Sequence, residues 1–307
     1  MMNPFLKEEL WSVLEKTHDG ECERHATGSA VFTTYYTKLN LLSFLKGKVQ
    51  KRVRIIGLPP SISLGGFEVE NEQGLDEIHE WLTDQDGHTL VINSEDPLAG
   101  DFSCVPTLPS VIIENRFESF DHYLNELRSH YRYRAIKAMK KFEGIVQMQN
   151  EPFDRSFYDM YDAVFQNSDY PLAKNDMIFF EQFPGTIEQF YAGDTPLGFC
   201  QYYIAEDTLY FMFCGINYEM LKTYDTYLNM LLVIIRRGIE AGVKTIDLGQ
   251  TTETIKQKLG GILKPLYICH YHKNPLVRSL MKKAMPILGY TAPTVRYHVF
   301  KNEGDQS

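Results

Sequence analysis

The sequence lacks any hydrophobic run long enough to cross a membrane. Its best candidate, LNMLLVIIRRG at 228–238, breaks after eight residues, whereas a transmembrane helix requires roughly 18. The opening stretch, MMNPFLKEELWSVLEK, carries acids and has no apolar core of the kind found in a signal peptide. We therefore expect a soluble protein without a membrane span.

The sequence contains few cysteines, and they are widely spaced. No Cys-x-x-Cys pair occurs among the five cysteines, which are Cys22, Cys104, Cys200, Cys214 and Cys269. An odd number of widely spaced cysteines in a chain of this length fits reduced thiols better than a disulfide framework. This pattern predicts a cytoplasmic location.

Several signatures of enzyme classes are missing as well. The sequence contains no Gly-x-Ser-x-Gly elbow, no Walker loop and no Rossmann fingerprint, so hydrolase, NTPase and dehydrogenase interpretations have no support. His270 and His272 share one face of an expected strand, but no third ligand stands at a suitable spacing. We expect no metal site.

The composition indicates an ordinary globular protein. A chain of 307 residues is long for one core and short for three, which favours two domains. Its residues are 44% hydrophobic, 13% aromatic and 23% charged, which excludes a disordered chain. The net charge of −9 argues against a whole surface built for nucleic acid and leaves room only for a local basic patch.

Charge is distributed unevenly along the chain. Residues 61–122 contain 14 Asp or Glu against one base, Arg116, which gives this segment a charge of −13. A basic stretch follows within a helical pattern at about 119–142, where Ser119 is the expected N-cap. We predict that this helix joins two lobes, 1–117 and 118–307.

The basic stretch of this helix has two interpretations. Its bases cover more than one helix face, and they are Arg128, Arg132, Arg134, Lys137, Lys140 and Lys141. They either form a solvated face that pairs with the neighbouring acids or provide guanidinium groups for a phosphate ligand. We retain Arg132 and Arg134 as candidate ligand-binding residues.

The second lobe has a distinctive order of expected elements. A strand and two helices precede a meander at 186–216, in which turns at Gly193-Asp194 and Glu206-Asp207 join neighbouring strands. A long helix at about 222–241 and a strand at 244–249 follow, and this crossover predicts parallel pairing with the preceding strand. The first lobe reads as a smaller, divergent copy of the same plan, with strands at 52–58, 88–94 and 109–117.

This order, with the residues at its joints, resembles the GNAT acyltransferase fold and, more narrowly, its FemAB-like branch, whose members join two GNAT-type domains in one chain. Four stretches carry the resemblance: FESFDHYLNELRSHYRYRAIKAMKKF, PLGFCQYYIAEDTLYFMFCGI, IDLGQTTETIKQKLGG and PLYICHYHKNPL. The resemblance covers about 117–276 and implies an α+β chain with a mixed sheet and two GNAT-like lobes.

The resemblance implies acyl transfer to the amine of a small molecule or peptide. The donor is acyl-CoA in most GNAT enzymes and aminoacyl-tRNA in the FemAB enzymes that build peptidoglycan bridges, which makes tRNA a candidate partner. GNAT enzymes that use coenzyme A hold its pyrophosphate on a glycine-rich loop before the long helix. Here that loop, NYEMLKTYDTYLN, contains no glycine, so we expect weak or absent coenzyme A binding.

Three residues of this loop, Lys222, Tyr224 and Tyr227, are candidates for binding substrate or phosphate. Asp225 near the helix start would repel a pyrophosphate, and Lys222 would compensate for it. Tyr224 and Tyr227 share one helix face, which either lines the ligand site or packs on the sheet.

The resemblance also implies catalytic residues. Asp247, at the end of the strand, would orient or deprotonate the attacking amine, or would only cap the next turn. Lys256 aligns with the lysine of the FemAB-like pattern and would stabilise phosphate or oxyanion charge, whereas the alternative is an exposed helix lysine. We expect Lys256→Ala to impair activity more than Lys258→Ala does, with little loss of stability.

Two further candidate groups complete the site. The backbone of the splayed strand end is expected to align the donor, and this segment comprises Phe213, Cys214, Gly215 and Ile216. Tyr267, on the following strand, joins the substrate-binding candidates. The alternative from a different class is a non-catalytic GNAT-fold protein that binds a ligand or partner in a degenerate cleft. The sequence does not indicate the oligomeric state.

Overall fold

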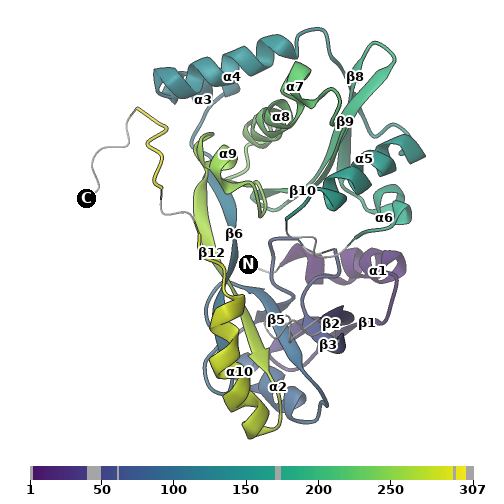
Figure 1. The fold of residues 1–307 in the computed structure, drawn as a ribbon, viewed down its shortest axis with the longest axis vertical. Coiled ribbons are helices and arrows are strands. Elements are labelled where there is room, and N and C mark those ends of the chain that lie inside the picture. The colour runs from purple at the N-terminus through teal and green to yellow at the C-terminus, as the bar shows by residue number, and fades with distance from the viewer. Residues whose placement is uncertain (1–2, 40–49, 61, 170–173, 293–294, 302–307) are drawn as a thin grey trace. The chain divides into compact units, whose positions relative to one another are not determined.

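The computed structural model describes residues 3–39, 50–60, 62–169, 174–292 and 295–301 (Figure 1). The chain folds into two compact units. Unit 1 comprises residues 1–109 and 265–292, and unit 2 comprises residues 110–264 and 293–307. Strands β6 (Ser103–Glu114) and β12 (Ile262–Tyr271) each run from one unit into the other.

This division differs from the lobes 1–117 and 118–307 that we expected from the sequence. The first boundary lies near the expected position, but residues 265–292 belong to unit 1 instead of the second lobe. The reason is strand pairing: β12 pairs antiparallel with β5 (Thr89–Ser94), with His270 opposite Leu90. The C-terminal part of the chain thereby returns to the first unit.

Unit 1 is a mixed sheet with helices. Its remaining elements are η1 (Pro4–Leu6), α1 (Glu8–Thr17), β1 (Cys22–Ala26), β2 (Ala30–Leu39), β3 (Lys51–Ile56), β4 (Phe67–Val69), α2 (Glu72–Thr83) and α10 (Pro275–Leu288). The strand order is β1-β2-β3-β5-β12-β6, with β4 paired to β2, and β3 and β5 pair in parallel. Helix α2 buries Ile78 and Leu82 against Phe32 and Val91 of the sheet, as expected of an amphipathic helix.

Unit 2 continues from β6 with the order β6-β11-β10-β9-β8-β7. Its strands are β7 (Val146–Gln149), β8 (Thr186–Ala192), β9 (Thr195–Ala205), β10 (Thr208–Ile216) and β11 (Thr245–Asp247). Its helices are α3 (Phe120–Glu126), α4 (Ser129–Lys141), α5 (Arg155–Gln166), α6 (Met177–Gln182), α7 (Leu221–Tyr224), α8 (Thr226–Glu240) and α9 (Glu253–Gln257). Helix α8 covers one face of β8–β10, and α5 and α6 cover the other (Figure 1).

The predicted meander and crossover are confirmed. β9 and β10 form an antiparallel hairpin in which Thr208 lies opposite Ala205. β11 pairs parallel with β10, with Leu209 opposite Ile246. These pairings follow from the short turn between β9 and β10 and from the helical crossover between β10 and β11.

Two helices that we predicted as continuous are interrupted. The helix expected at 119–142 consists of α3 and α4, which are separated at Leu127 and Arg128, neither of which is helical. Its predicted N-cap is confirmed, because the Ser119 hydroxyl accepts a hydrogen bond from the His122 amide at 3.1 Å. The helix expected at 222–241 is interrupted by Asp225, whose φ of 47° lies in the left-handed region.

A buried carboxylate in the core of unit 2 is paired with a partly exposed arginine. Glu188 on β8 is fully buried, and Arg237 on α8 donates to it through Nε at 3.0 Å and Nη2 at 2.8 Å. The pKa of Arg237 is raised, chiefly by this hydrogen bonding. Such a bidentate pair fixes the rotation of α8 on the sheet, because removal of Arg237 would leave the Glu188 carboxylate buried without a cation.

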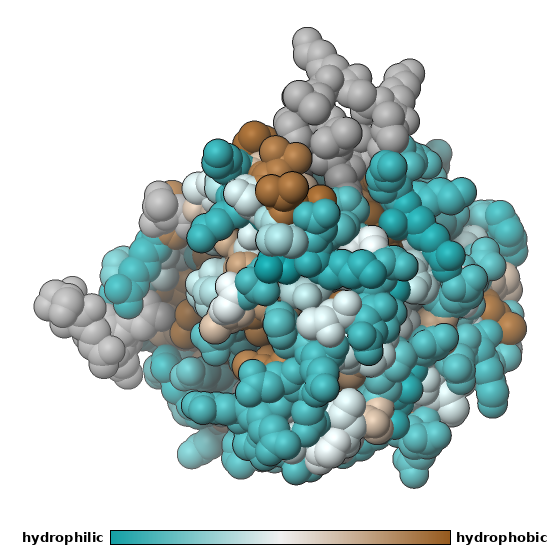
Figure 2. All heavy atoms as spheres, turned by 90° about the horizontal axis from the view of Figure 1, so that it is seen from below, coloured by the Kyte–Doolittle hydropathy of each residue, from teal (hydrophilic) through white to brown (hydrophobic). Residues whose placement is uncertain are grey.

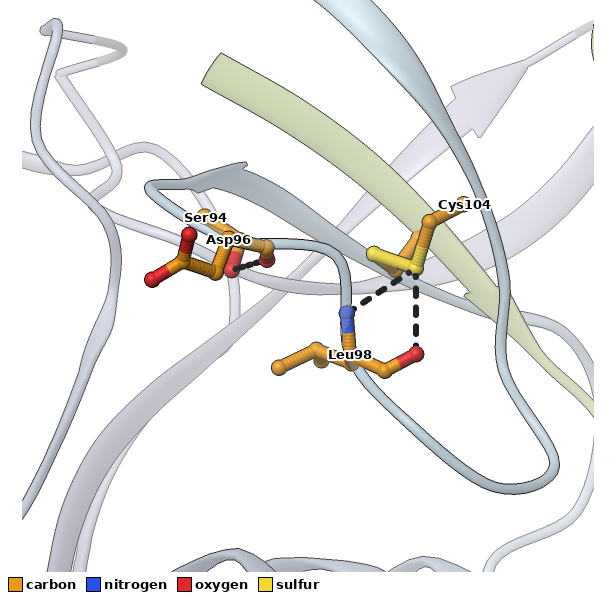
Figure 3. Close-up of a disulfide and its surroundings, with 5 residues drawn as sticks. Ser94, Asp96, Leu98 and Cys104 are labelled. Carbon is orange, nitrogen blue, oxygen red and sulfur yellow. Dashed lines mark hydrogen bonds between the residues drawn. A yellow bond between two sulfur atoms is a disulfide. The ribbon is translucent and has the colours of Figure 1, made fainter. Parts of the chain in front are cut away.

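A disulfide in unit 1 contradicts the expectation of reduced thiols. Cys104 on β6 is bonded to Cys269 on β12 (Figure 3). The two residues are 165 positions apart in sequence, yet β6 and β12 are neighbouring strands, which brings their Cα atoms within 4.0 Å. The Leu98 amide also donates to the Cys104 sulfur at 3.2 Å, which ties the loop before β6 to the bridge. The argument for a cytoplasmic location from reduced cysteines therefore loses its basis.

The structure also bears on membrane insertion. Within the described ranges, no helix combines the length and the apolar composition that crossing a bilayer would require.

Candidate functional site

The candidate site of unit 2 lies where two parallel strands part. β11 pairs with β10 only over Thr208–Tyr210 and ends at Asp247, whereas β10 continues to Ile216. Between Phe211 and Phe213 the register of β10 against β9 shifts, which marks a β-bulge. A bulge bends a strand and redirects its backbone groups. The donor-aligning candidates 213–216 therefore lie on the segment of β10 that extends beyond β11.

Close packing explains one of these four residues. A Cβ atom at Gly215 would lie 2.4 Å from the Phe199 ring and 2.8 Å from the Tyr161 amide nitrogen. Only glycine fits this approach of α5 to the strand. Cys214, next to it, has its pKa raised to about 12 by burial, so its thiol stays protonated at neutral pH.

Asp247 is buried and caps the turn that follows β11. Its Oδ1 accepts hydrogen bonds from the Ser110 hydroxyl at 2.5 Å and from the Gly249 amide at 2.8 Å, and its side chain is 6% exposed. The turn-capping alternative is thus present in the structure, through Gly249 instead of Gln250 or Thr251. Ser110, which comes from β6, had no signal in the sequence near Asp247.

Lys256 is buried, not an exposed helix lysine. It is 2% exposed, and its ammonium donates to the carbonyl oxygens of Gly249 at 3.1 Å and Gln250 at 2.6 Å. Burial lowers its pKa to about 8, while the nearby Asp247 acts in the opposite direction. The expectation that its replacement would cost little stability rested on an exposed or cleft side chain, and this burial removes that premise.

The loop that Lys256 holds has an unusual backbone. Gly249, Thr251 and Thr252 all have positive φ, at 73°, 62° and 49°. Threonine is β-branched and rarely adopts this conformation, which costs of order 1–3 kcal/mol for each residue. Local strain of this kind persists only where the surroundings impose it, and the two hydrogen bonds from Lys256 provide such a restraint.

Tyr227 contacts the same loop from α8. Its hydroxyl forms a hydrogen bond of 2.7 Å with the Thr252 hydroxyl, and burial raises its pKa. It therefore faces the loop as well as packing against the apolar core, and Tyr224 packs against that core too. Thr252 was not among the candidates from the sequence, since nothing in the pattern marks its left-handed conformation.

Two cations line a cavity beside this loop. The cavity has a volume of about 310 Å³ and is lined by Arg134, Thr252, Glu253, Thr254, Ile255 and Lys258. Arg134 comes from α4, and the Lys258 ammonium lies 5.2 Å above the ring of Tyr297. The structure thus brings together Arg134, a predicted phosphate-binding residue, and Lys258, which we expected to matter less than Lys256. Arg132 is half-buried on the same helix.

The start of α8 differs from the expected arrangement in one respect. Asp225 forms an ion pair of 2.9 Å with Lys141 of α4, so its compensating cation is Lys141 and not Lys222. Lys222 is exposed, and its carbonyl oxygen accepts a hydrogen bond from the same Lys141 ammonium at 3.1 Å. Tyr267 belongs to unit 1, where it packs against an apolar cluster that includes Val91 and Cys269.

No metal is indicated at these residues. In the part of the chain that the structure describes, no three His, Cys, Asp or Glu side chains are placed to hold an ion together. The donors gathered at the site are instead a carboxylate, an ammonium, two hydroxyls and the backbone of β10. Such a set suits polar and anionic groups of an organic substrate.

Comparison with known proteins places this geometry in a family context. Residues 177–257 match the family model described as an acetyltransferase (GNAT) domain. The match includes Asp247, Lys256 and the segment 213–216. No curated protein matches the chain.

Solved structures share the fold of nearly the whole chain. FemX aligns with a TM-score of 0.57 and 12% identity, over 91% of this chain and 94% of its own. L-PGS from Bacillus licheniformis aligns with a TM-score of 0.55 and 13% identity, over 90% of this chain and 92% of its own. The C-terminal domain of a putative lysylphosphatidylglycerol synthetase from Agrobacterium fabrum aligns with a TM-score of 0.56 and 11% identity, over 93% of this chain and 94% of its own. The predicted tandem GNAT-like fold and the FemAB-like resemblance are confirmed.

Proposed function

From the premise that this chain is an acyltransferase with a GNAT domain and a FemAB-like fold, we propose that it transfers an acyl group to a substrate amine by direct attack. The observation that carries the proposal is the parting of β10 and β11, with Asp247 and Lys256 at the end of the shorter strand. A new C–N bond forms, the bond from the acyl carbon to the leaving oxygen or sulfur breaks, and the proton that the amine loses is balanced by protonation of the leaving group to an alcohol or thiol.

The segment of β10 beyond β11 supplies the donor site in this proposal. Backbone groups at 213–216 that β11 does not pair would hydrogen-bond to the acyl group and align its carbonyl. Such fixed donors are worth most where charge develops in the transition state. The bulge between Phe211 and Phe213 would direct them toward the acyl carbon.

Lys256 has one proposed role beyond holding the loop. An ammonium has three N–H donors, and two of them are assigned to the carbonyls of Gly249 and Gln250. We assign the third to the oxyanion of the tetrahedral intermediate. Asp247 would accept a hydrogen bond from the attacking amine, since a carboxylate has room for about four such bonds.

The donor class that the site favours is an aminoacyl-tRNA instead of an acyl-CoA. Asp225 and its partner Lys141 occupy the start of α8, where coenzyme A users present bare amides to a pyrophosphate. The cavity with Arg134 and Lys258 offers two cations for a phosphate backbone. Aminoacyl-tRNA is also the donor that the FemAB-like resemblance implies.

The test is a transfer assay with two donor sets in parallel. The purified chain is incubated with a radiolabelled mixture of aminoacyl-tRNAs, or with a panel of acyl-CoAs, together with a panel of primary amines. We expect label to move from the tRNA to an amine, and R134A/K258A to weaken tRNA binding and reduce its log–log salt slope by about 2. R155A/K244A, which removes two exposed cations elsewhere in unit 2, should change neither transfer nor specific donor recognition.

Other outcomes would overturn the proposal at different levels. Transfer from acyl-CoA but not from tRNA would reject the donor and retain the acyl transfer. Binding of either donor without turnover under any condition would favour the alternative, a non-catalytic GNAT-fold protein.

A further inference from the structure

Helix α10 of unit 1 buries only one of its faces. It begins after Asn274, whose side chain caps it by accepting from the Leu276 amide at 2.9 Å. Its inner face contributes Met281, Ala284 and Met285, which pack with Val105 of β6. This contact anchors the helix to the unit.

The outer face of α10 is an exposed apolar stripe. Leu276, Leu280 and Ile287 have exposed fractions of 79%, 65% and 64%. Their spacings of four and seven residues place them along one side of the helix. Single exposed apolar residues are ordinary, but three in line on one helix indicate a surface that acts in contact with another molecule.

The charges on this helix have one sign. From His270 to Asn302 the sequence contains no Asp or Glu, although the whole chain has a net charge of −9. Lys283 lies along the stripe between Leu280 and Ile287, and Lys282 lies about 100° further around the helix; both are exposed. Within the described residues, neither lysine forms an ion pair.

We propose that α10 docks the protein onto the surface of an anionic lipid bilayer. The helix has 14 residues, so it is about 21 Å long and too short to span the roughly 30 Å of hydrocarbon. An amphipathic helix with a lysine-rich polar side lies in the plane of the interface, with its apolar face at the boundary between headgroups and acyl chains. Leu276, Leu280 and Ile287 enter that boundary, and Lys282 and Lys283 bind lipid phosphates.

Charge complementarity favours this occupant over a second copy of the chain. A symmetric dimer through the stripe would set the same residues of both copies against one another. Lys282 and Lys283 would then meet their own equivalents, and α10 has no acid to neutralise them. An anionic bilayer instead has phosphate groups that bind both lysines and an acyl-chain region that accepts the apolar stripe. Figure 2, seen from below the view of Figure 1, shows a largely hydrophilic face with hydrophobic side chains gathered in a few places.

The experiment is co-sedimentation of the full chain with vesicles. One vesicle preparation is pure phosphatidylcholine, and the other contains one third phosphatidylglycerol. We expect binding to the anionic vesicles only. K282Q/K283Q should weaken it by about fivefold for each lysine, and L280S by about tenfold. The controls are K16Q/K38Q and I204S, which remove exposed residues of the same types elsewhere and should bind as the unaltered chain does.

Each remaining outcome would overturn the proposal. Equal binding of L280S and the unaltered chain would show that the stripe is not the contact. A dimer in light scattering that L280S converts to a monomer, without vesicle binding, would assign the stripe to a second copy. Because L280S removes an exposed side chain, its melting temperature should match that of the unaltered chain, and so a loss of binding would not reflect unfolding.

Discussion

Replacing Lys256 by methionine tests the account of the loop after β11. The substitution removes two hydrogen bonds from a cationic donor and leaves the carbonyls of Gly249 and Gln250 without that partner. Each lost bond costs about 1.5–3 kcal/mol. Removing a buried cation returns part of this, about 3 kcal/mol for a pKa lowered from 10.5 to about 8. We therefore expect K256M to lower the free energy of unfolding by about 2 kcal/mol near neutral pH.

The same substitution has a pH signature with a defined sign. Between the folded pKa of about 8 and the unfolded value of 10.5, the unfolded chain binds more protons at Lys256 than the folded chain does. The stability of the unaltered chain therefore rises with pH in this window. K256M lacks this contribution, so its deficit should grow by about 2 kcal/mol between about pH 7.5 and 9.5.

The assay is urea unfolding followed by far-ultraviolet circular dichroism at several pH values. K258M is the matched control, since Lys258 is only half-buried and its known contact is with the Tyr297 ring. It should cost less than about 1 kcal/mol, with no change across the same pH range. Equal losses of unfolding free energy for the two variants, or a K256M deficit that does not change with pH, would refute the claim that buried Lys256 holds the loop after β11.

Three further predictions concern other parts of the chain. D247N should lower the transfer rate by about a hundredfold, while D207N, which breaks a surface ion pair, should leave it unchanged; similar rates for the two variants would exclude Asp247 from the reaction. Thiol titration of the denatured, unreduced protein should find three free thiols of the five cysteines, and five would contradict the disulfide. R237M should destabilise the protein by about 3–5 kcal/mol, because it leaves Glu188 buried without its cation. E188Q/R237M should recover much of that loss. A double variant as unstable as R237M would argue against the pairing.

The architecture of unit 2 could be predicted because its signals are local. The turns at Gly193-Asp194 and Glu206-Asp207 define the meander, and the apolar periodicity of the following helix defines the crossover. The interruptions at Arg128 and Asp225 escaped prediction because hydrophobic periodicity continues through them. A change of backbone conformation at one residue leaves no trace in such a pattern.

Long-range pairings could not be predicted in the same way. Cys104 and Cys269 are 165 positions apart, and only the adjacency of β6 and β12 brings them together. The return of residues 265–292 to unit 1 depends on the same pairing. In the candidate site, Asp247 and Lys256 were found by their resemblance to the FemAB-like pattern. Their hydrogen bonds to Ser110 and to the loop carbonyls required the fold.

The burial of Lys256 shows the limit of reasoning from spacing. Two lysines two positions apart must point to different sides of a helix, and the structure buries Lys256 while Lys258 lines the cavity. Spacing did not indicate which side was solvent and which was the loop. The cavity beside Lys258 and Arg134 follows from α4, which lies more than a hundred residues earlier in the chain.

The central claim is that acyl transfer occurs where β10 and β11 part, with an aminoacyl-tRNA as donor. Its most direct test is a single-turnover measurement in which radiolabelled aminoacyl-tRNA is mixed with excess protein and a primary amine, and the amide product is followed over time. We expect label in the amide with the unaltered chain and with K244M, which removes an exposed lysine elsewhere in unit 2, and at least a hundredfold slower transfer with K256M. Unchanged transfer by K256M, or no amide product from any donor with the unaltered chain, would contradict it.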